Sequence, residues 1–310
     1  MGGSAWKAAV MSDGCALAFD SLPNNSVIDD LAALAGLFER LLEKTGHEMA
    51  DCQGLGISLA EIVDSEAKSC PSPCYKHPYF EGNNVERIVR DHIDLPVEVD
   101  NDARAALLGE ESYGVFRDLG SASDNVLIIT LGTGIGVAAR VDGVMLRGSS
   151  ATGGTLGGHM TVDINGPRCI CGNRGCAEAL ASGYAMKCFV PQQAWFAKST
   201  LRNEKQPTFR MLTDAVRQGD KFAKQGLDGF CEAWTSLLVS LVHVLGPAHV
   251  AVSGGFSRSA DLFLPCITEA VRDRLWDPRI MPQIHVAEEP EASGVRGAEV
   301  LVRSATHEYV

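Results

Sequence analysis

Three cysteines and a histidine lie close together in the middle of this sequence, and they restrict the local fold more than any other feature. The residues are His159, Cys169, Cys171 and Cys176. Zn²⁺ prefers four soft or borderline ligands in a tetrahedron, and three cysteines with one histidine form a common structural set. Glycines between the cysteines permit the tight turns that bring three thiolates to one point. Unrelated buried cysteines are the alternative, but the density of ligands favours a structural zinc site.

Length, charge and hydropathy argue against several classes of protein. The 310 residues suffice for two lobes with separate cores. A net charge of −12 argues against a nucleic-acid partner, because proteins that bind the phosphate backbone usually carry a basic surface. The longest apolar stretch, residues 234–252, is interrupted by polar residues, which argues against a membrane span. The sequence does not open with a secretion signal, and its ten cysteines favour a reducing compartment, so we expect a cytoplasmic protein.

Apolar residues recur alternately at strand spacing and at helix spacing along the chain. Strands are predicted at 6–10, 16–19, 54–60, 96–99, 126–131, 137–141, 250–253 and 284–287. Helices are predicted at 31–42, 85–93, 103–113, 211–245 with a break near Gly219, 259–275 and 294–304. Residues 70–84 contain three prolines and are predicted to form a surface loop. The alternation of strands and helices indicates an α/β architecture.

The cysteine-rich run also carries a family resemblance. From His159 to Glu178 it reads His-x9-Cys-x-Cys-Gly-x2-Gly-Cys-x-Glu. This pattern resembles the signature of the ROK family of bacterial sugar kinases and sugar-responsive repressors. Other segments that resemble ROK motifs follow in the same order along almost the whole chain.

The resemblance implies a fold that periodicity alone does not specify. ROK proteins have a two-lobed, actin-like (ribonuclease-H-like) α/β fold. We therefore expect a small lobe at 1–112, to which residues 291–310 return. The large lobe is expected at 113–290 and contains the zinc-binding loop.

Asn101 and Asp102 stand between the predicted strand 96–99 and the helix that follows it. Asn and Asp are favoured helix N-caps, so a purely structural role is one interpretation. A carboxylate at the end of a strand can instead take the proton from an attacking sugar hydroxyl. Residues 98–110 resemble the ROK segment that holds the catalytic aspartate. This resemblance assigns Asp102 as the general base and Asn101 as a sugar ligand.

Two glycine-rich turns follow predicted strands. Gly132, Thr133 and Gly134 form the first, where backbone N–H groups can approach a polyphosphate, although the motif alone also suits a plain hairpin. Gly254 and Gly255 form the second, which by itself fits any connection from a strand to a helix. The resemblance implies that the first turn binds the phosphates of ATP, that the second binds its adenosine, and that Mg²⁺ accompanies the nucleotide.

The start of the sequence departs from the ROK pattern. ROK kinases usually begin with an apolar strand that ends in Asp-x-Gly-Gly-Thr and cradles phosphate. Gly2, Gly3 and Ser4 match the end of that motif, and the resemblance assigns Gly3 and Ser4 to the nucleotide. The aspartate and its strand would precede Met1. Without that central strand, its neighbours would have unpaired backbone groups. Without the aspartate, Mg²⁺ would be held less well.

The resemblance places the sugar beside the zinc loop. His159 would bind zinc through one ring nitrogen and orient the sugar with the other, and Glu178 would accept hydrogen bonds from sugar hydroxyls. ROK proteins usually have Glu-x-Gly-His here, but Leu156 takes the place of the glutamate. A missing acceptor costs about 1–3 kcal/mol if its donor stays buried, so the sugar preference of relatives does not transfer. A group from the loop 70–84 could replace it.

Together these residues predict an ATP-dependent kinase that phosphorylates a hydroxyl of a hexose or an N-acetylhexosamine. The alternative is a catalytically degenerate sugar-binding or sensor protein, which the missing aspartate favours and Asp102 disfavours. A repressor would need a helix-turn-helix domain before the sugar domain, where this chain has no residues to spare. The expected partners are a small-molecule sugar and ATP, without nucleic acid or membrane. The resemblance also suggests a homodimer.

Overall fold

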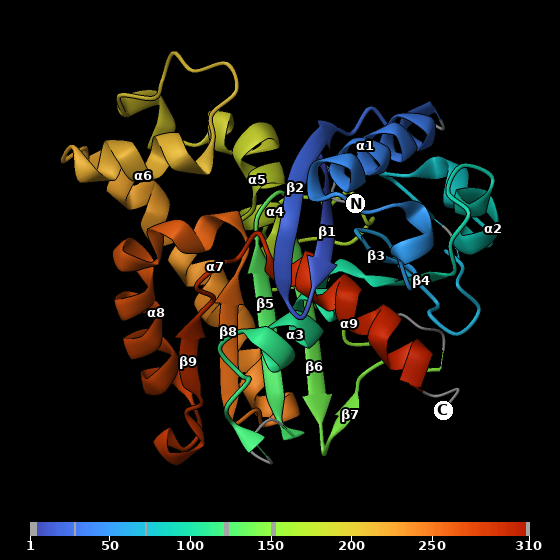
Figure 1. Ribbon diagram of the computed structural model, residues 1–310. Coiled ribbons are helices and arrows are strands. Elements are labelled where there is room, and N and C mark those ends of the chain that lie inside the picture. Colours follow the sequence, from blue (N-terminus) through green and yellow to red (C-terminus); the bar gives the residue numbers. More distant parts are fainter. Residues whose placement is uncertain (1–4, 28, 72, 121–123, 150–152, 308–310) are drawn as a thin grey trace. The chain divides into compact units, whose positions relative to one another are not determined.

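A computed structural model describes residues 5–27, 29–71, 73–120, 124–149 and 153–307 (Figure 1). The chain divides into two compact units. The first unit comprises Met1–Gly120, Leu146–Thr155 and Ala287–Val310, and the second comprises Ser121–Met145 and Leu156–Val286. The predicted lobes, 1–112 with 291–310 and 113–290, differ from these units mainly in residues 146–155. The boundaries of the two lobes therefore stay a prediction.

The described residues of the first unit contain four strands in two pairs. β1 (Ala5–Ser12) and β2 (Cys15–Pro23) form an antiparallel hairpin. β3 (Leu55–Leu59) and β4 (Val97–Asn101) are parallel. The helices of this unit are α1 (Asp29–Thr45), α2 (Val85–Arg90), α3 (Asp102–Tyr113) and α9 (Ser293–His307), with the 3₁₀ turns η1 (Met49–Asp51) and η2 (Pro78–Phe80).

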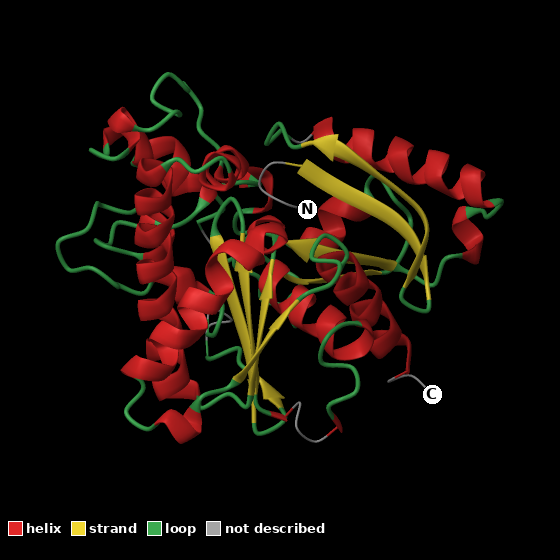
Figure 2. Ribbon diagram, turned by 90° about the vertical axis from the view of Figure 1, so that its left-hand side faces the viewer, coloured by secondary structure: helices red, strands yellow, loops and turns green. Residues whose placement is uncertain are grey.

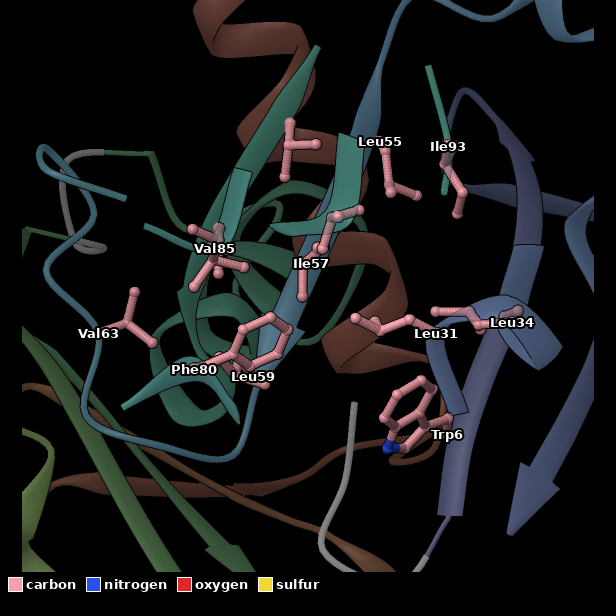
Figure 3. Close-up of a cluster of buried hydrophobic side chains, with 14 of the residues drawn as sticks. Trp6, Leu31, Leu34, Leu55, Ile57, Leu59, Val63, Phe80, Val85 and Ile93 are labelled. Atoms are coloured by element: carbon pink, nitrogen blue, oxygen red, sulfur yellow. The ribbon is translucent and has the colours of Figure 1, made fainter. Parts of the chain in front are cut away.

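Neither pair of strands extends into a larger sheet within the described residues. β1 pairs only with β2, and β3 pairs only with β4. One hydrophobic core nevertheless contains residues from both pairs, including Trp6 from β1 and Ile57 from β3, together with Leu31 from α1 (Figure 3). Within the described residues, each strand of these two pairs therefore has one edge without a strand partner.

The C-terminal helix α9 holds the turn between β1 and β2. Gly14 in that turn has a φ of +77°, and its N–H donates to Oε2 of Glu299 at 2.9 Å. Arg296 donates back to the carbonyl oxygen of Gly14 at 3.2 Å. A Cβ on residue 14 would lie 2.4 Å from the ring of Tyr113, at the end of α3, so only glycine fits. These contacts bring the last helix of the chain to the first unit.

The second unit is built on a five-stranded sheet with the order β7-β6-β5-β8-β9. Its strands are β5 (Val126–Leu131), β6 (Ile135–Val141), β7 (Val144–Met145), β8 (His249–Ser253) and β9 (Gln283–Val286). β5 is antiparallel to β6 and parallel to β8, which is parallel to β9. β5 and β8 are almost entirely buried, as expected for central strands with continuous apolar sequences.

Three longer helices accompany this sheet. They are α6 (Phe209–Arg217), α7 (Lys221–Leu245) and α8 (Ala260–Arg274), drawn in red in Figure 2. The predicted break near Gly219 separates α6 from α7, and this glycine has a φ of +86°. Of the helices in the described ranges, none is both long enough and apolar enough to cross a bilayer.

The periodic elements begin and end within a few residues of their predicted positions, but several short elements were not predicted. α3 begins at Asp102 rather than Ala103, and β6 begins at Ile135 rather than Val137. The unpredicted elements in the described residues include η1, η2, β7, α4 (Ala177–Leu180), α5 (Gly183–Cys188), and the 3₁₀ turns η4 (Leu156–His159), η5 (Val190–Gln192), η6 (Phe196–Lys198), η7 (Gly255–Ser259) and η8 (Pro278–Ile280). Such elements are too short to show a hydrophobic period.

Candidate functional site

The four predicted zinc ligands converge in the second unit. His159 ends η4, and the three cysteines lie in the loop before α4. The ligand atoms of His159, Cys169, Cys171 and Cys176 all lie within 4.8 Å of one another. Nδ1 of His159 is 3.6 Å from Sγ of Cys169, and the Sγ atoms of Cys171 and Cys176 are 3.7 Å apart. Two sulfurs at 2.3 Å from a tetrahedral zinc would be separated by ~3.8 Å, so the donor set fits this ion.

Glycines and buried thiols shape the zinc loop. Gly175 has a φ of +66°, and a Cβ there would lie 1.6 Å from the carbonyl oxygen of Asp163. Gly172 also has a positive φ, of +90°, but open space surrounds it. Burial and then the neighbouring thiols raise the pKa of Cys176 to about 12. Thiolates at this position therefore require a cation, which is consistent with a metal site.

Two further cysteines that lie close together in the sequence, Cys70 and Cys74, have no such arrangement. Cys70 and Cys74 are both buried in the first unit. Burial is the main cause that raises the pKa of each thiol. Within the described ranges, the ligands around His159 are the only cluster of three or more potential metal-binding side chains. The Cys70–Cys74 pair therefore remains a loop feature.

Glu178 contacts the first glycine turn. Its Oε2 accepts the backbone N–H of Ile135 at 2.9 Å. A Cβ on Gly134 would lie 2.4 Å from the same oxygen, so the carboxylate packs directly on the turn. Gly183 and Tyr184, which the sequence did not single out, also hold this turn. Their N–H groups donate to the carbonyl oxygens of Gly132 and Thr133, each at 2.8 Å. No local sequence signal links α5 to this turn.

The second glycine turn lies next to the first. β5 and β8 are parallel, with Thr130 opposite Ser253, so their following turns emerge at the same edge of the sheet. Gly254 has a φ of +84°, and a Cβ there would lie 2.5 Å from the carbonyl oxygen of Leu131. Gly255 then begins η7. The other predicted nucleotide ligands, Gly3 and Ser4, lie outside the described residues.

Asn101 and Asp102 stand at the junction of β4 and α3 in the first unit. Asn101 is the N-cap, because its side-chain oxygen accepts the N–H of Ala103 at 3.0 Å. Its Nδ2 donates to Oδ1 of Asp102 at 3.1 Å and to the carbonyl oxygen of Glu61 at 3.0 Å. Oδ1 of Asp102 also accepts the N–H of Ala103 at 2.9 Å. Its Oδ2 has no hydrogen-bond partner in the described part of the chain. The capping interpretation thus applies to Asn101 and leaves Asp102 with one oxygen available.

A buried charge network surrounds this junction, and the sequence did not indicate it. Asp100 and Arg104 are both fully buried, and their Oδ1 and Nη1 atoms are 3.3 Å apart. Arg147 donates to the other oxygen of Asp100 at 2.7 Å. Arg104 also donates to the carbonyl oxygens of Leu146, at 3.3 Å, and Gly153, at 2.9 Å. These contacts explain why residues 146–155 belong to the first unit.

Glu61 organises the loop after β3 in a similar way. Its carboxylate accepts the N–H groups of Lys76, at 2.6 Å, and His77, at 2.8 Å, and lies 3.3 Å from Nδ1 of the His77 ring. Burial alone would raise the pKa of Glu61, but these hydrogen bonds outweigh it and hold that pKa below its ordinary value. Burial lowers the pKa of His77, and the contact with Glu61 only partly opposes the change. The carboxylate therefore pairs with a largely neutral, fully buried imidazole.

The candidate residues thus fall into two sets. Asn101 and Asp102 belong to the first unit. The zinc ligands, Glu178 and both glycine turns belong to the second. Each set is assembled by contacts within its own unit.

Known proteins resemble this chain along nearly all of its length. A family model described as ROK family matches residues 1–305. The glucokinase of Thermotoga maritima is 33% identical over 291 residues, which cover 92% of this chain and 88% of that protein. The crystal structure of a ROK family glucokinase from Streptomyces griseus in complex with glucose and AMPPNP has a TM-score of 0.79 at 25% identity, covering 98% of this chain and 97% of that one.

A different kind of relative matches less of its own length. The xylose repressor of Bacillus subtilis is 26% identical over 223 residues, which cover 72% of this chain but only 53% of the repressor. The matches that cover most of both chains include these two glucokinases. They confirm the fold class predicted from the sequence.

Proposed function

The chain belongs to the ROK family as an enzyme of the sugar-kinase type, and we propose that it transfers the γ-phosphoryl group of ATP to a hydroxyl of a hexose or an N-acetylhexosamine. The observation that carries this proposal is the carboxylate of Asp102. One oxygen is fixed by the N–H of Ala103 and by Asn101, and the other has no partner in the described residues. A fixed carboxylate with one available oxygen suits a general base.

In the proposed reaction, Asp102 accepts the proton of the attacking sugar hydroxyl. Phosphoryl transfer depends mainly on positioning and on the neutralisation of charge, so a well-placed base and a held nucleotide are the main requirements. Asn101 keeps the carboxylate in place through Nδ2, which also donates to the carbonyl oxygen of Glu61. It is also a proposed ligand of the sugar, and this contact requires one of the two Nδ2 hydrogen bonds to be exchanged for one to the sugar. Its side-chain oxygen remains committed to the helix cap.

The sugar-binding residues of this proposal include His159 and Glu178. Nδ1 of His159 faces the zinc ligands, which leaves Nε2 for a sugar hydroxyl. Oε2 of Glu178 accepts the N–H of Ile135, which leaves Oε1 for the sugar. Leu156, where ROK proteins usually have a glutamate, is 41% exposed and supplies no acceptor. The acceptor sugar is therefore bound with a different set of polar contacts than in relatives that have this glutamate.

The proposed nucleotide site consists of the two glycine turns, Gly132, Thr133 and Gly134 with Gly254 and Gly255, together with Gly3 and Ser4. The N–H of Gly134 has no partner in the described part of the chain and is available to a phosphate oxygen. Mg²⁺ would accompany ATP and neutralise phosphate charge. Zinc would be structural, held by His159 and the three cysteines, and would supply no step of the reaction. A cytoplasmic location and a homodimer stay predictions.

Measurement of ADP release tests the kinase proposal. A panel of hexoses and N-acetylhexosamines is assayed with the wild-type chain, with Asp102→Asn, and with Asp94→Asn as a control, because the Asp94 side chain is 92% exposed. We expect sugar-dependent turnover that Asp102→Asn reduces by about 10²–10⁴-fold and Asp94→Asn leaves unchanged. Equal loss in both variants, or none in either, would contradict the role of Asp102.

The second candidate function is that of a sugar-binding protein without kinase activity. It is the alternative that the sequence leaves open, and the carboxylate of Asp102 counts against it. Absence of turnover with every sugar, together with sugar binding by calorimetry, would establish this alternative.

A further inference from the structure

The zinc loop and the first glycine turn meet on the same strand, β6. η4, which ends in His159, packs against the start of this strand, and no space remains between them for a side chain at position 157 or 158. A Cβ on Gly158 would lie 2.2 Å from the carbonyl oxygen of Ile135, and one on Gly157 would lie 2.6 Å from the side chain of Val137. The segment that carries the histidine ligand is therefore fitted closely to the residues that follow the turn.

The cysteine end of the zinc loop reaches the same place through α4. Cys176 is fully buried and is the N-cap of this helix, and Glu178 is its second residue. The N–H of Ala177 donates to the carbonyl oxygen of Met160 at 3.0 Å. A helix of a single turn has no stability of its own, so its position depends on these attachments. The position of Glu178 therefore depends on Cys176, a zinc ligand.

Glu178 transmits this position to the glycine turn in two ways. Its carboxylate accepts the N–H of Ile135 at 2.9 Å, and its backbone carbonyl accepts the hydroxyl of Ser182 at 2.6 Å. Ser182 caps α5, whose N–H groups at Gly183 and Tyr184 hold the carbonyls of the turn. The turn itself contains glycines at 132 and 134, which have the largest conformational freedom to lose. Its shape is thus set from outside, by α4 and α5.

We propose that Glu178 is a positioning residue through which bound zinc fixes the first glycine turn, residues 132–134, in the conformation that binds nucleotide phosphate. The proposal rests on the proposed function in taking this turn as the nucleotide site. It assigns to Glu178 a role separate from any contact with the sugar. It also makes zinc a determinant of nucleotide affinity, although the ion touches no nucleotide.

The negative charge of Glu178 is not what the turn requires. A carboxylate beside a phosphate-binding loop repels the ligand, whereas the hydrogen bond to Ile135 needs only an acceptor oxygen. Glutamine supplies that oxygen and alanine does not. Removal of the acceptor leaves the N–H of Ile135, a buried residue, without its partner. The two substitutions therefore separate positioning from charge.

Calorimetry with AMPPNP tests the proposal on the full chain, with and without zinc. The proteins are the wild type, Glu178→Ala, Glu178→Gln and a control, Glu204→Ala, which changes an exposed glutamate of the same unit. Each is measured with zinc, after removal of zinc by a chelator, and after zinc is restored. We expect zinc removal and Glu178→Ala each to weaken AMPPNP binding by about 3–10-fold. Glu178→Gln and Glu204→Ala should stay within about two-fold of wild type in the presence of zinc.

The decisive result is non-additivity. If zinc acts through Glu178, its removal should weaken AMPPNP binding to Glu178→Ala by less than about two-fold. Independent, additive losses would overturn the proposal. So would unchanged AMPPNP affinity in Glu178→Ala combined with a loss of sugar affinity, because Glu178 would then act on the sugar alone.

Hydrogen exchange separates this proposal from the proposed function. The amide of Ile135 should exchange faster in Glu178→Ala and in zinc-depleted wild type than in the zinc-loaded protein, and glutamine should restore its protection. A second outcome is that the amide of Ile135 exchanges faster in these two samples while the wild type binds no AMPPNP. That result would support the coupling of zinc to the turn but refute a nucleotide site there. Unchanged exchange would overturn the coupling itself, even if AMPPNP binds.

Discussion

The guanidinium of Arg104 lies 3.3 Å from the carboxylate of Asp100, and both side chains are fully buried next to the proposed catalytic aspartate. Asp100 is the last residue but one of β4, and Arg104 lies in the first turn of α3. The pair therefore fixes the strand-to-helix junction that presents Asp102. Burial lowers the pKa of Arg104, and the charge of Asp100 opposes this change.

Replacement of Arg104 by methionine should destabilise the protein severely. In this variant the carboxylate of Asp100 keeps its contact with Arg147 but loses the one with Arg104. The carbonyl oxygens of Leu146 and Gly153 also lose the hydrogen bonds that Arg104 donates. Breaking one partner of a buried pair costs about 3–5 kcal/mol. The free energy of unfolding, measured with urea, should fall by this amount. The exposed pair Arg90–Asp94 provides the control, since Arg90→Met should change stability by less than ~1 kcal/mol. Equal losses in the two variants would contradict the interpretation.

Stability should decrease as the pH falls below about 6.5, and His77 should account for part of the decrease. Burial holds the pKa of His77 below its ordinary value of 6.5. The unfolded chain therefore takes up a proton in this range that the folded chain does not, so protons favour unfolding. The depressed pKa of Glu61 adds a loss of the same sign below about 4.5.

The difference in unfolding free energy between pH values of about 7.5 and 5.5 measures this effect. His77→Gln should reduce the difference, whatever it does to stability at the higher pH. His249 and His285 also have pKa values lowered by burial, so part of the slope should remain. His92→Gln, at an exposed position, is the matched control and should leave the slope unchanged. An unaltered slope in His77→Gln would mean that folding does not lower the pKa of His77.

Two glycines of the zinc loop should tolerate alanine very differently. Both have positive φ values, so each substitution costs about 1–2 kcal/mol in backbone strain. Only at Gly175 would the added Cβ collide with backbone, at 1.6 Å from the carbonyl oxygen of Asp163. Gly175→Ala should therefore weaken zinc binding by at least about tenfold more than Gly172→Ala, as measured by competition with a chromogenic chelator. Similar zinc affinities in the two variants would show that the loop relaxes freely.

Introduction of a glutamate at position 156 should strengthen sugar binding. Leu156 is 41% exposed and stands where ROK proteins usually have the glutamate that contacts the sugar. Leu156→Glu should lower the KM for the preferred sugar by about tenfold, the value of a hydrogen bond to a charged acceptor, and leave the KM for ATP unchanged. Leu156→Gln should give a smaller gain and Leu156→Ala none. A parallel change in both KM values would indicate a general rearrangement instead.

The parts of the fold that were predictable are those encoded by neighbours in the sequence. A repeat of apolar residues at strand or helix spacing indicates an element, so β5 and α7 lie almost where they were predicted. The zinc ligands could be grouped for the same reason, since His159 and Cys176 are separated by a single short loop. Segments of a single turn, such as η4 and α4, are too short to show this period, and the sequence did not reveal them.

By itself, then, the sequence determined the order of the periodic elements, the grouping of the four candidate zinc ligands and the junction of Asn101 with Asp102. Only the tertiary structure decided which of these features touch. It placed Glu178 on Ile135, and it fastened Gly14 to Glu299, 285 positions away. A side chain can form such a contact only after the chain has closed a long loop, and no local propensity specifies its partner. The contact of Glu178 with Ile135 joins the cysteine-rich loop to the glycine turn, and the contact of Gly14 with Glu299 joins the last helix to the first hairpin.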